Sequence, residues 1–440
     1  MPASLADSAL HRDLFGDAEI SALFTDAAVI RAMLLVEGAL ARVQGELGLI
    51  PAEAAGLIDR ASREVQIDPA ALAPQAARDG VPVPALVAAF RKTGGPAEQM
   101  QYLHWGATSQ DIMDTALAVR LRRVLDLWEA RIDTLLDSLA RLAAAHAALP
   151  MVARTYGQAA VPTTFGAVVA GWGWPLCDWR RDLSDLRRSL LQVSLSGAAG
   201  TLAAMGEKGP QVRERLAQAL GLHDPGRSWH SDRSPVARLA GHAAGLAGSL
   251  GKIAEDLILL SQSGIAEVSL GGGGGSSTMP QKENPVAPSA LLALARMVLG
   301  LAAPLQSSAL HRQQRDGAAW FTEWLALPQL CIFTGCGLAL SGEIASQLTP
   351  LPKAMRRNLD AEKGLIYAEA LTFALTERMP RHEAADRVKA LCRETIQTCV
   401  PLADLAHRDF PGTDWPAVLE ATSLGQAPAE ARRFSVSASN

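Results

Sequence analysis

The feature that most constrains this chain is one long stretch of helical periodicity that begins at Leu117. Apolar residues recur there at steps of four and three, at Leu117, Leu121, Val124, Trp128, Ile132, Leu135, Leu139 and Leu142. Charged residues fill much of the remaining surface, so the pattern predicts one amphipathic helix with a single apolar seam. The helical pattern runs to Leu149, where Pro150 stops it. At ~1.5 Å per residue such a helix exceeds about 45 Å, a length typical of helix bundles.

Three further segments are helical in composition and rich in apolar or small residues. Residues 234–263 contain four spaced glycines, at Gly241, Gly245, Gly248 and Gly251. Because glycine costs about 1 kcal/mol in an exposed helix, this density predicts close approach by neighbouring helices. Residues 286–305 and 332–348 are apolar nearly all round, as expected of helices at the centre of a bundle. No alternating strand pattern of useful length and no βαβ rhythm is visible, so we predict an all-α fold.

Two breaks suggest how the chain is divided. Gly94–Gly95–Pro96 interrupts the N-terminal helical region, and a turn at Pro350–Pro352 precedes a more charged region of shorter helices. We therefore expect an N-terminal helical domain at 1–109, a central long-helix bundle at 110–350 and a C-terminal helical domain at 351–440.

Composition excludes several classes of protein. Of the 440 residues, 49% are hydrophobic and only 20% are charged, which rules out a disordered chain. The net charge of −4 offers no basic surface for a polyanion, so we expect no nucleic-acid partner. A surface short of charge also suggests that a partner subunit covers part of it.

Cysteine usage and targeting signals point to the cytoplasm. The chain has five cysteines and no CxxC pair, so neither a zinc knuckle nor a disulfide framework is indicated. The N-terminus has no basic region followed by an apolar one, so we expect no signal peptide. Residues 159–177 and 325–342 lack charge, but both contain proline, glycine and hydroxyl or amide side chains. We predict buried helices there and no membrane span.

The most unusual segment is GGGGGSSTMPQKENP, at 271–285. A flexible surface linker is one interpretation, whereas the apolar flanks, diverse polar residues and two prolines favour a site. A phosphate-binding P-loop is excluded because no Gly-Lys-Ser/Thr follows the glycines. Serine becomes a useful acid or base when backbone N–H groups and a cation stabilise its alkoxide. Lys282 can supply that cation, and Asn284 can donate to a substrate carboxylate, so the segment suits proton transfer at a carbon next to a carboxylate.

Two other segments carry polar residues near helix starts. HWGATSQDIMDT, at 104–115, offers Thr108 and Ser109 just before a helix and Asp111 in its first turn. Helix capping is one interpretation, and binding of a substrate anion at the helix N-terminus is the other. RTYGQAAVPTTF, at 154–165, follows the Pro150 break and by itself predicts a loop leading into a core helix. The near miss HEAAD, at 382–386, lacks the second histidine of a zinc motif, and we expect neither a metal nor an organic cofactor.

Together these three segments resemble the fumarase/aspartase superfamily, which includes adenylosuccinate and argininosuccinate lyases. The family's signature loop reads GSSxMPxKxNP, and residues 275–285 match all eight fixed positions. Residues 104–115 and 154–166 resemble its first and second conserved regions, in the same order and spacing. Within the superfamily the chain resembles most the family of bacterial 3-carboxy-cis,cis-muconate cycloisomerases, through SGAAGTLAAMGEKG at 196–209, SWHSDR at 228–233 and GLIYAEA at 364–370.

The resemblance implies a function and a set of site residues. It implies a homotetramer in which the three segments of each active site come from three subunits. It implies lactonisation of a small tricarboxylate, 3-carboxy-cis,cis-muconate, to 4-carboxymuconolactone in aromatic-compound breakdown through the β-ketoadipate pathway. Ser276 and Lys282 are the implied catalytic residues, with Ser276 preferred over Ser277 as the proton donor. The implied substrate-binding residues are His104, Thr108, Ser109, Tyr156, Gln158, Arg233, Ser277, Asn284 and Arg315.

One departure from the family pattern is informative. Many family lyases have a Thr-His-x-Gln pattern in the second region, where the histidine protonates a leaving amine or hydroxyl. Tyr156 stands in that place here. A carboxylate leaving group has little need of a general acid, so the tyrosine favours a cycloisomerase. A fumarate-releasing lyase of the adenylosuccinate or argininosuccinate type is the alternative enzyme, and a catalytically inert helical scaffold is the alternative outside enzymes.

Overall fold

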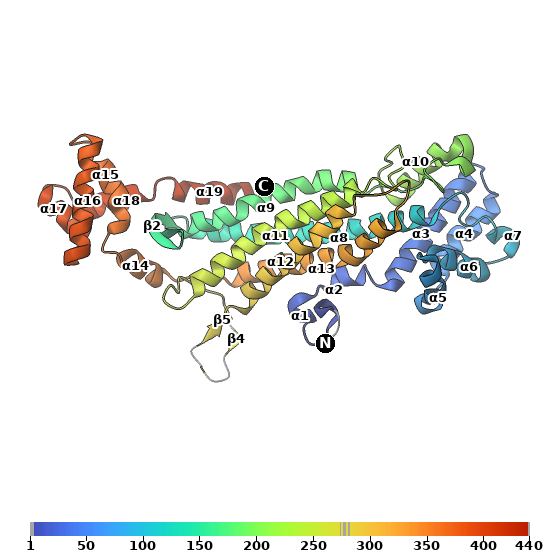
Figure 1. Ribbon diagram of the computed structural model, residues 1–440, viewed down its shortest axis with the longest axis horizontal. Coiled ribbons are helices and arrows are strands. Elements are labelled where there is room, and N and C mark those ends of the chain that lie inside the picture. Colours follow the sequence, from blue (N-terminus) through green and yellow to red (C-terminus); the bar gives the residue numbers. More distant parts are fainter. Residues whose placement is uncertain (1–3, 273, 276–278, 280–281, 439–440) are drawn as a thin grey trace. The chain divides into compact units, whose positions relative to one another are not determined.

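The computed structural model describes residues 4–272, 274–275, 279 and 282–438 and is mostly helical (Figure 1). Contacts between residues divide the chain into two compact units. Unit 1 contains Met1–Arg131, Trp179–Gly248 and Ala293–Ala339, and unit 2 contains Ile132–Asp178, Ser249–Leu292 and Leu340–Asn440. The division into domains at 1–109, 110–350 and 351–440 stays a prediction.

Five long helices supply residues to both units. They are α8 (Ser109–Ala145), α9 (Phe165–Leu190), α11 (Ser234–Ser261), α12 (Val286–Ser307) and α13 (Gly317–Gln347). The predicted seam of α8 is confirmed, because its middle positions from Leu121 to Leu139 are buried. The helix ends at Ala145 and not at Leu149, since the chain turns before it reaches Pro150.

The glycines of α11 confirm close packing at one position. A Cβ atom on Gly245 would lie 2.2 Å from the ring of Trp179, so only glycine fits there. At Gly248, in contrast, none of the described residues outside the helix's own backbone and the two chain neighbours has an atom within 4 Å of the place a Cβ atom would take. Close approach by a neighbouring helix therefore accounts for Gly245 and does not account for Gly248.

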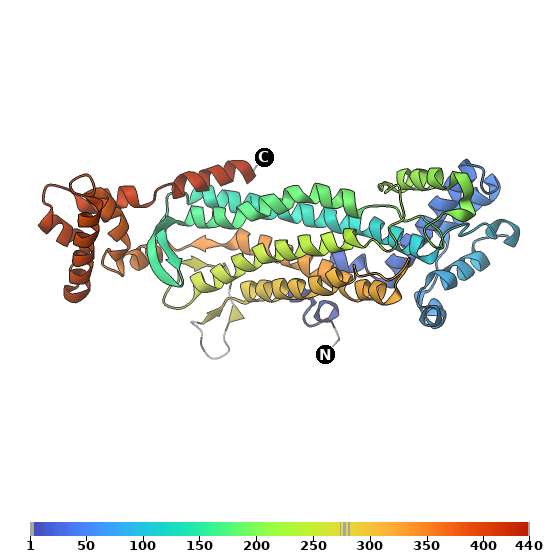
Figure 2. The same ribbon diagram turned by 45° about the horizontal axis from the view of Figure 1, so that its top comes forward.

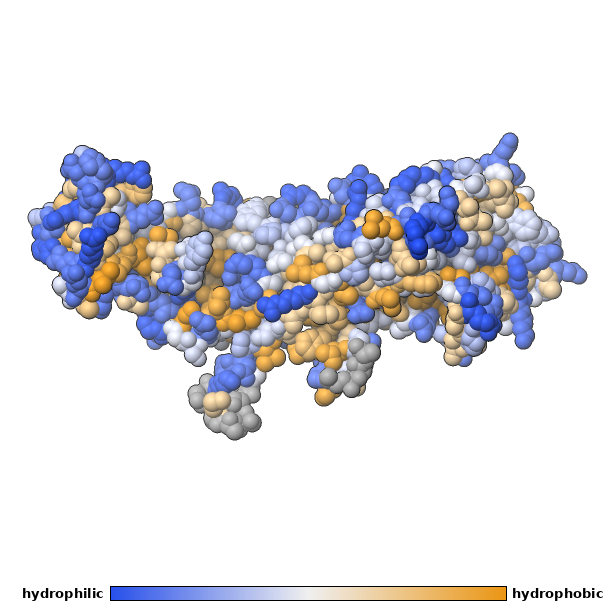
Figure 3. All heavy atoms as spheres, viewed as in Figure 1, coloured by the Kyte–Doolittle hydropathy of each residue, from blue (hydrophilic) through white to orange (hydrophobic). Residues whose placement is uncertain are grey.

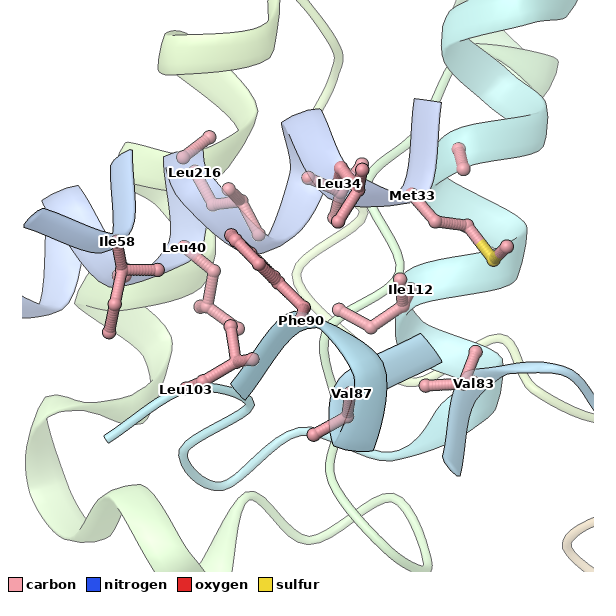
Figure 4. Packing of buried hydrophobic residues seen from close by; sticks show 14 of the residues in the cluster. Met33, Leu34, Leu40, Ile58, Val83, Val87, Phe90, Leu103, Ile112 and Leu216 are labelled. Atoms are coloured by element: carbon pink, nitrogen blue, oxygen red, sulfur yellow. The ribbon is translucent and has the colours of Figure 1, made fainter. Parts of the chain in front are cut away.

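In unit 1 most of the helices that precede α8 pack around one apolar cluster. They are α3 (Asp26–Glu46), α4 (Ala52–Glu64), α5 (Pro69–Asp79), α6 (Val83–Thr93) and α7 (Ala97–Met100), with α10 (Gly209–Leu220) following later in the chain. The short helices α1 (Arg12–Phe15) and α2 (Ala18–Ala22) come first in the chain and supply no residue to this cluster. Figure 4 shows Leu40 of α3, Phe90 of α6 and Leu216 of α10 meeting in this cluster. Ile112, one turn into α8, joins the same cluster and fixes the start of that helix.

In unit 2 a second apolar cluster joins α15 (Ala368–Leu375), α16 (Arg381–Thr398), α17 (Leu402–Asp409) and α18 (Trp415–Ser423). The helices α14 (Pro352–Asp360) and α19 (Ala427–Ala438) flank this group in the chain. Leu371, Val388, Leu405 and Trp415 lie in the shared cluster. The last helix, α19, packs through Phe434 on Trp174 of α9, with the two ring centroids 5.5 Å apart.

The segment expected to be a loop after Pro150 is a β-hairpin (Figure 2). Strands β1 (Pro150–Thr155) and β2 (Gln158–Thr164) are antiparallel, and Tyr156 and Gly157 form the turn with φ of 53° and 75°. Two consecutive positive φ values are typical of the turn that matches strand twist. This hairpin was not predicted from the sequence because Pro150 and Pro162 interrupt the pattern expected of a strand. The remaining strands are two-residue pairs, β3 (Val268–Ser269) with β6 (Thr349–Pro350) and β4 (Gly274–Gly275) with β5 (Glu283–Asn284).

Among the described residues, two helices, α12 and α13, are long and apolar enough to cross a membrane, by length and composition alone. In α13, 67% of the most apolar window is buried, as expected of a core helix, but in α12 only 39% is buried. Met297 and Leu299 of α12 are about half exposed, and Leu325 of α13 is 74% exposed. Figure 3 shows apolar side chains gathered over α12 and α13.

Candidate active site

The start of α8 is fixed by the buried carboxylate of Asp111. Its Oδ2 accepts hydrogen bonds from the backbone N–H groups of Thr108, at 3.0 Å, and Gly197, at 2.9 Å. Its Oδ1 accepts from the backbone N–H of Ser196, at 2.8 Å, and lies 2.7 Å from Nε2 of His230. The bond to Thr108 is the backward half of a capping box, in which a side chain in the first turn satisfies the cap residue. Asp111 thus caps the helix and also ties it to the loop at 196–197.

Arg315 lies beside this helix start. Its Nε donates to Oε1 of Gln110, at 2.8 Å, and its Nη2 donates to the carbonyl of Ala198, at 3.3 Å. The residue is exposed, and Gln110 is buried and also donates to the carbonyl of His230. The structure therefore brings Arg315, Thr108 and the half-buried Ser109 together around the N-terminus of α8, where backbone N–H groups favour an anion.

Arg233 has a different environment. Its guanidinium is fully buried and makes four hydrogen bonds to Asp114 and Glu323, the shortest being 2.6 Å to Glu323. Burial raises the pKa of Glu323 although Arg233 opposes this. Because it binds both carboxylates, the guanidinium of Arg233 is held in the interior of unit 1.

His104 is held by a carboxylate that sequence reasoning missed. Its Nδ1 lies 2.6 Å from Oε1 of Glu37, a buried residue of α3. The signal that could have found Glu37 is its position in the apolar run MLLVEGAL, at 33–40, where a charge needs a buried partner.

In unit 2 the β1–β2 hairpin presents two further predicted residues. Tyr156 is fully exposed at the turn, and Gln158 is exposed at the first position of β2. The hairpin is anchored near its tip by Arg154, which donates to both oxygens of Glu267 at 2.8 and 2.9 Å. Asn358 of α14 also donates to Glu267, at 2.8 Å. Arg154 is a second residue whose role sequence reasoning did not assign.

The hairpin also borders a cavity of about 520 Å³ in unit 2. Its lining includes Arg154, Gly157, Lys252, Asp256 and Leu259. Asp256 there accepts a hydrogen bond from Trp172, at 2.7 Å, and also pairs with Lys252. The cavity thus combines an apolar wall with an ion pair that is already satisfied.

The glycine-rich loop is described only in part. Ser276 and Ser277 lie outside the described residues. Lys282 is exposed, and its backbone N–H donates to the carbonyl of Met279, at 3.0 Å. Asn284 is half-buried in β5, opposite Gly274 of β4. In the part of the chain that the structure describes, no group of three or more His, Cys, Asp or Glu residues has the arrangement of a metal site.

Comparisons with known proteins agree with the resemblance that the sequence motifs indicate. A family model described as Lyase matches residues 13–300. The 3-carboxy-cis,cis-muconate cycloisomerase of Bradyrhizobium diazoefficiens is 42% identical to this chain over an alignment of 400 residues that covers 89% of this chain and 88% of that protein. The protein of the same name from Pseudomonas aeruginosa is 39% identical over 87% of this chain and 84% of its own length. The solved structure of 3-carboxy-cis,cis-muconate lactonizing enzyme from Pseudomonas putida covers 98% of this chain and 99% of that chain, with a TM-score of 0.92 and 34% identity.

Proposed function

The chain belongs to this lyase family, and we propose that within it the protein is a cycloisomerase that converts 3-carboxy-cis,cis-muconate to 4-carboxymuconolactone. The observation that carries the proposal is similarity along nearly the whole chain to relatives named for this reaction. The cluster at the start of α8 supports it, because Thr108, Ser109 and Arg315 offer an anion site of the kind a carboxylate needs.

We propose the following chemistry for the site. One substrate carboxylate adds intramolecularly to the conjugated double bond, and the electron pair moves to the carbon next to another carboxylate. Lys282 and Asn284 stabilise the charge that spreads into that carboxylate. Ser276 then delivers a proton to the carbon. The lactone carries one carboxylate fewer than the substrate, so each turnover takes up one proton, which returns to Ser276 from solvent.

Tyr156 favours this reaction over a fumarate-releasing lyase. Viewed in reverse, lactonisation expels a carboxylate, which needs no general acid, whereas amine release does. The exposed position of Tyr156 at the hairpin turn supports a role that depends on a second surface to complete the site.

We also propose a cytoplasmic homotetramer with active sites shared between subunits. The half-exposed apolar residues of α12 support a covering partner, since large exposed apolar surfaces mark interfaces. The exposure of Tyr156, Gln158 and Lys282 supports a site completed by another copy of the chain.

The proposal is tested by offering purified protein 3-carboxymuconate, adenylosuccinate and argininosuccinate in parallel. We expect loss of the conjugated-diene absorbance with 3-carboxymuconate, uptake of one proton per lactone formed, and no turnover of the other two. Fumarate release from either of the others would favour the alternative lyase, and binding of 3-carboxymuconate without turnover would favour an inert scaffold. Light scattering after size-exclusion chromatography tests the tetramer, and a monomer would contradict the shared site.

A further inference from the structure

Glu37 is a buried carboxylate with one hydrogen-bonded side-chain partner among the residues that the structure describes. Its side chain is 1% exposed on α3, among apolar neighbours in the sequence. An isolated buried carboxylate is costly, so such residues are normally paired. Its Oε1 bonds to Nδ1 of His104, at 2.6 Å, and its Oε2 has no hydrogen-bond partner within the described residues. A glutamate in this position is therefore explained by what it does to His104.

The backbone on both sides of His104 is held as well. His104 itself has a φ of 64°, a conformation that side-chain-bearing residues seldom adopt without support. Gln44 of α3 donates to the carbonyl of Trp105, at 2.8 Å, and Arg91 of α6 donates to the carbonyl of Leu103, at 2.9 Å. Two helices thus clamp the peptide groups that flank a strained residue.

The imidazole keeps one nitrogen free. The side chain of His104 is 19% exposed, and its Nε2 makes no hydrogen bond among the residues that the structure describes. The contact with Glu37 fixes the orientation of the ring and places the proton of the neutral form on Nδ1, which leaves Nε2 as an acceptor. When the ring is protonated, both nitrogens donate, so Nε2 then offers an N–H group to an anion.

We propose that Glu37 is a positioning residue that holds His104 as a cationic donor to a carboxylate of the substrate. The inference rests on the proposed function, since it gives His104 a tricarboxylate to bind. It adds a residue 67 positions upstream of His104 that none of the three family motifs contains. Its role is to orient and charge another side chain, and it does not itself touch the substrate.

The charges around His104 agree with this role. The ionisable groups that face the imidazole are Glu37 from α3, Asp111 from α8 and Arg91 from α6. Burial by itself lowers the pKa of His104, and Arg91 lowers it further. The charge and hydrogen bond of Glu37, together with Asp111, outweigh both, so the pKa of His104 is raised.

The test compares Glu37→Gln with the wild-type protein in steady-state kinetics between about pH 5.5 and 8. Glutamine keeps the shape and can still accept from Nδ1, but it removes the charge. At pH 8 we expect KM for 3-carboxymuconate to rise about tenfold, the size of one charge-assisted hydrogen bond, with kcat changed less than about threefold. KM should recover as the pH falls and His104 becomes protonated without Glu37. Glu46→Gln, at an exposed position of the same helix, is the matched control and should leave KM unchanged.

A second variant separates failure of the inference from failure of the proposed site. His104→Gln should raise KM at every pH, and adding Glu37→Gln to it should raise KM no further. If His104→Gln leaves KM unchanged, His104 does not bind substrate and the proposed site is wrong. If His104→Gln raises KM while Glu37→Gln behaves like wild type at all pH values, the positioning role of Glu37 is overturned. A KM rise in Glu37→Gln that is the same at all pH values, with an unchanged melting temperature, overturns the charging role.

Discussion

Replacing Arg233 by methionine should expose what its buried ion pairs contribute. The substitution leaves Asp114 and Glu323 together in the interior with no cation, and both side chains are at most 2% exposed. Breaking a buried pair by removing one partner costs about 3–5 kcal/mol. A change of 1 kcal/mol shifts the melting temperature by roughly 2–4 °C in a cooperative unit of ~150–250 residues, so we expect a loss on the order of 10 °C.

The loss should depend on pH in a defined direction. Burial already raises the pKa of Glu323, and without Arg233 it should rise further. A carboxyl group whose pKa is higher in the folded state destabilises that state as the pH rises above the unfolded value of about 4.3. The gap in melting temperature between Arg233→Met and wild type should therefore be wider at about pH 8 than at about pH 5. Circular dichroism during heating measures both values.

The matched control replaces an exposed arginine, and the rescue neutralises the two carboxylates that Arg233 binds. Arg227→Met removes an exposed arginine that pairs with Asp232 at 2.6 Å, and exposed pairs contribute only about 0.2–1 kcal/mol. Adding Asp114→Asn and Glu323→Gln to Arg233→Met should recover at least half of the lost melting temperature. If Arg233→Met melts like wild type but raises KM, the arginine contacts substrate directly, as the sequence suggested, and the burial argument fails.

Three further predictions concern separate parts of the molecule. Ser276→Ala should abolish turnover with the assembly intact on size-exclusion chromatography, and near-normal activity would exclude Ser276 as the proton donor. Gly245→Ala should lower the free energy of unfolding by about 1–3 kcal/mol, because the new Cβ atom would meet the ring of Trp179. Gly248→Ala has space for the Cβ atom and should raise the free energy of unfolding by about 0.4–1 kcal/mol. Equal melting temperatures of the two variants would contradict this reasoning. Burial lowers the pKa of His242 to about 4, so the folded state binds that proton less tightly than the unfolded chain and loses stability as the pH falls from about 6.5 to 4. His242→Gln should flatten that part of the pH–stability curve. An unchanged curve would show that another group causes the loss of stability.

The helical architecture was predictable because periodicity is a local property. The seam of α8 can be counted in the sequence, and its middle positions are buried as predicted. The hairpin was not predictable in the same way. Its turn places Tyr156 at positive φ, which no local preference of tyrosine indicates, and two prolines disguise its strands.

Some residues of the candidate site could likewise be predicted from the sequence, and others could not. Thr108, Ser109 and the glycine-rich loop stand out in the sequence because their residue types and spacing carry chemistry. Glu37 and Arg154 act through partners far away in the chain, His104 and Glu267, and only the fold brings these pairs together. The motif that contains Arg233 marked it as a candidate site residue, but residue spacing could not predict that two buried carboxylates bind it.

In the β1–β2 hairpin, the residue that stabilises the strands is different from the residue exposed at the turn. Arg154, bound to the buried Glu267, holds the strands, while Tyr156 makes so little contact that its side chain is as exposed as in an extended peptide. Exchanging that side chain for histidine removes no packing within the subunit, so the fold of the single chain imposes almost no penalty on the exchange. The side chain at this turn can therefore change without a cost to the folding of the subunit that carries it.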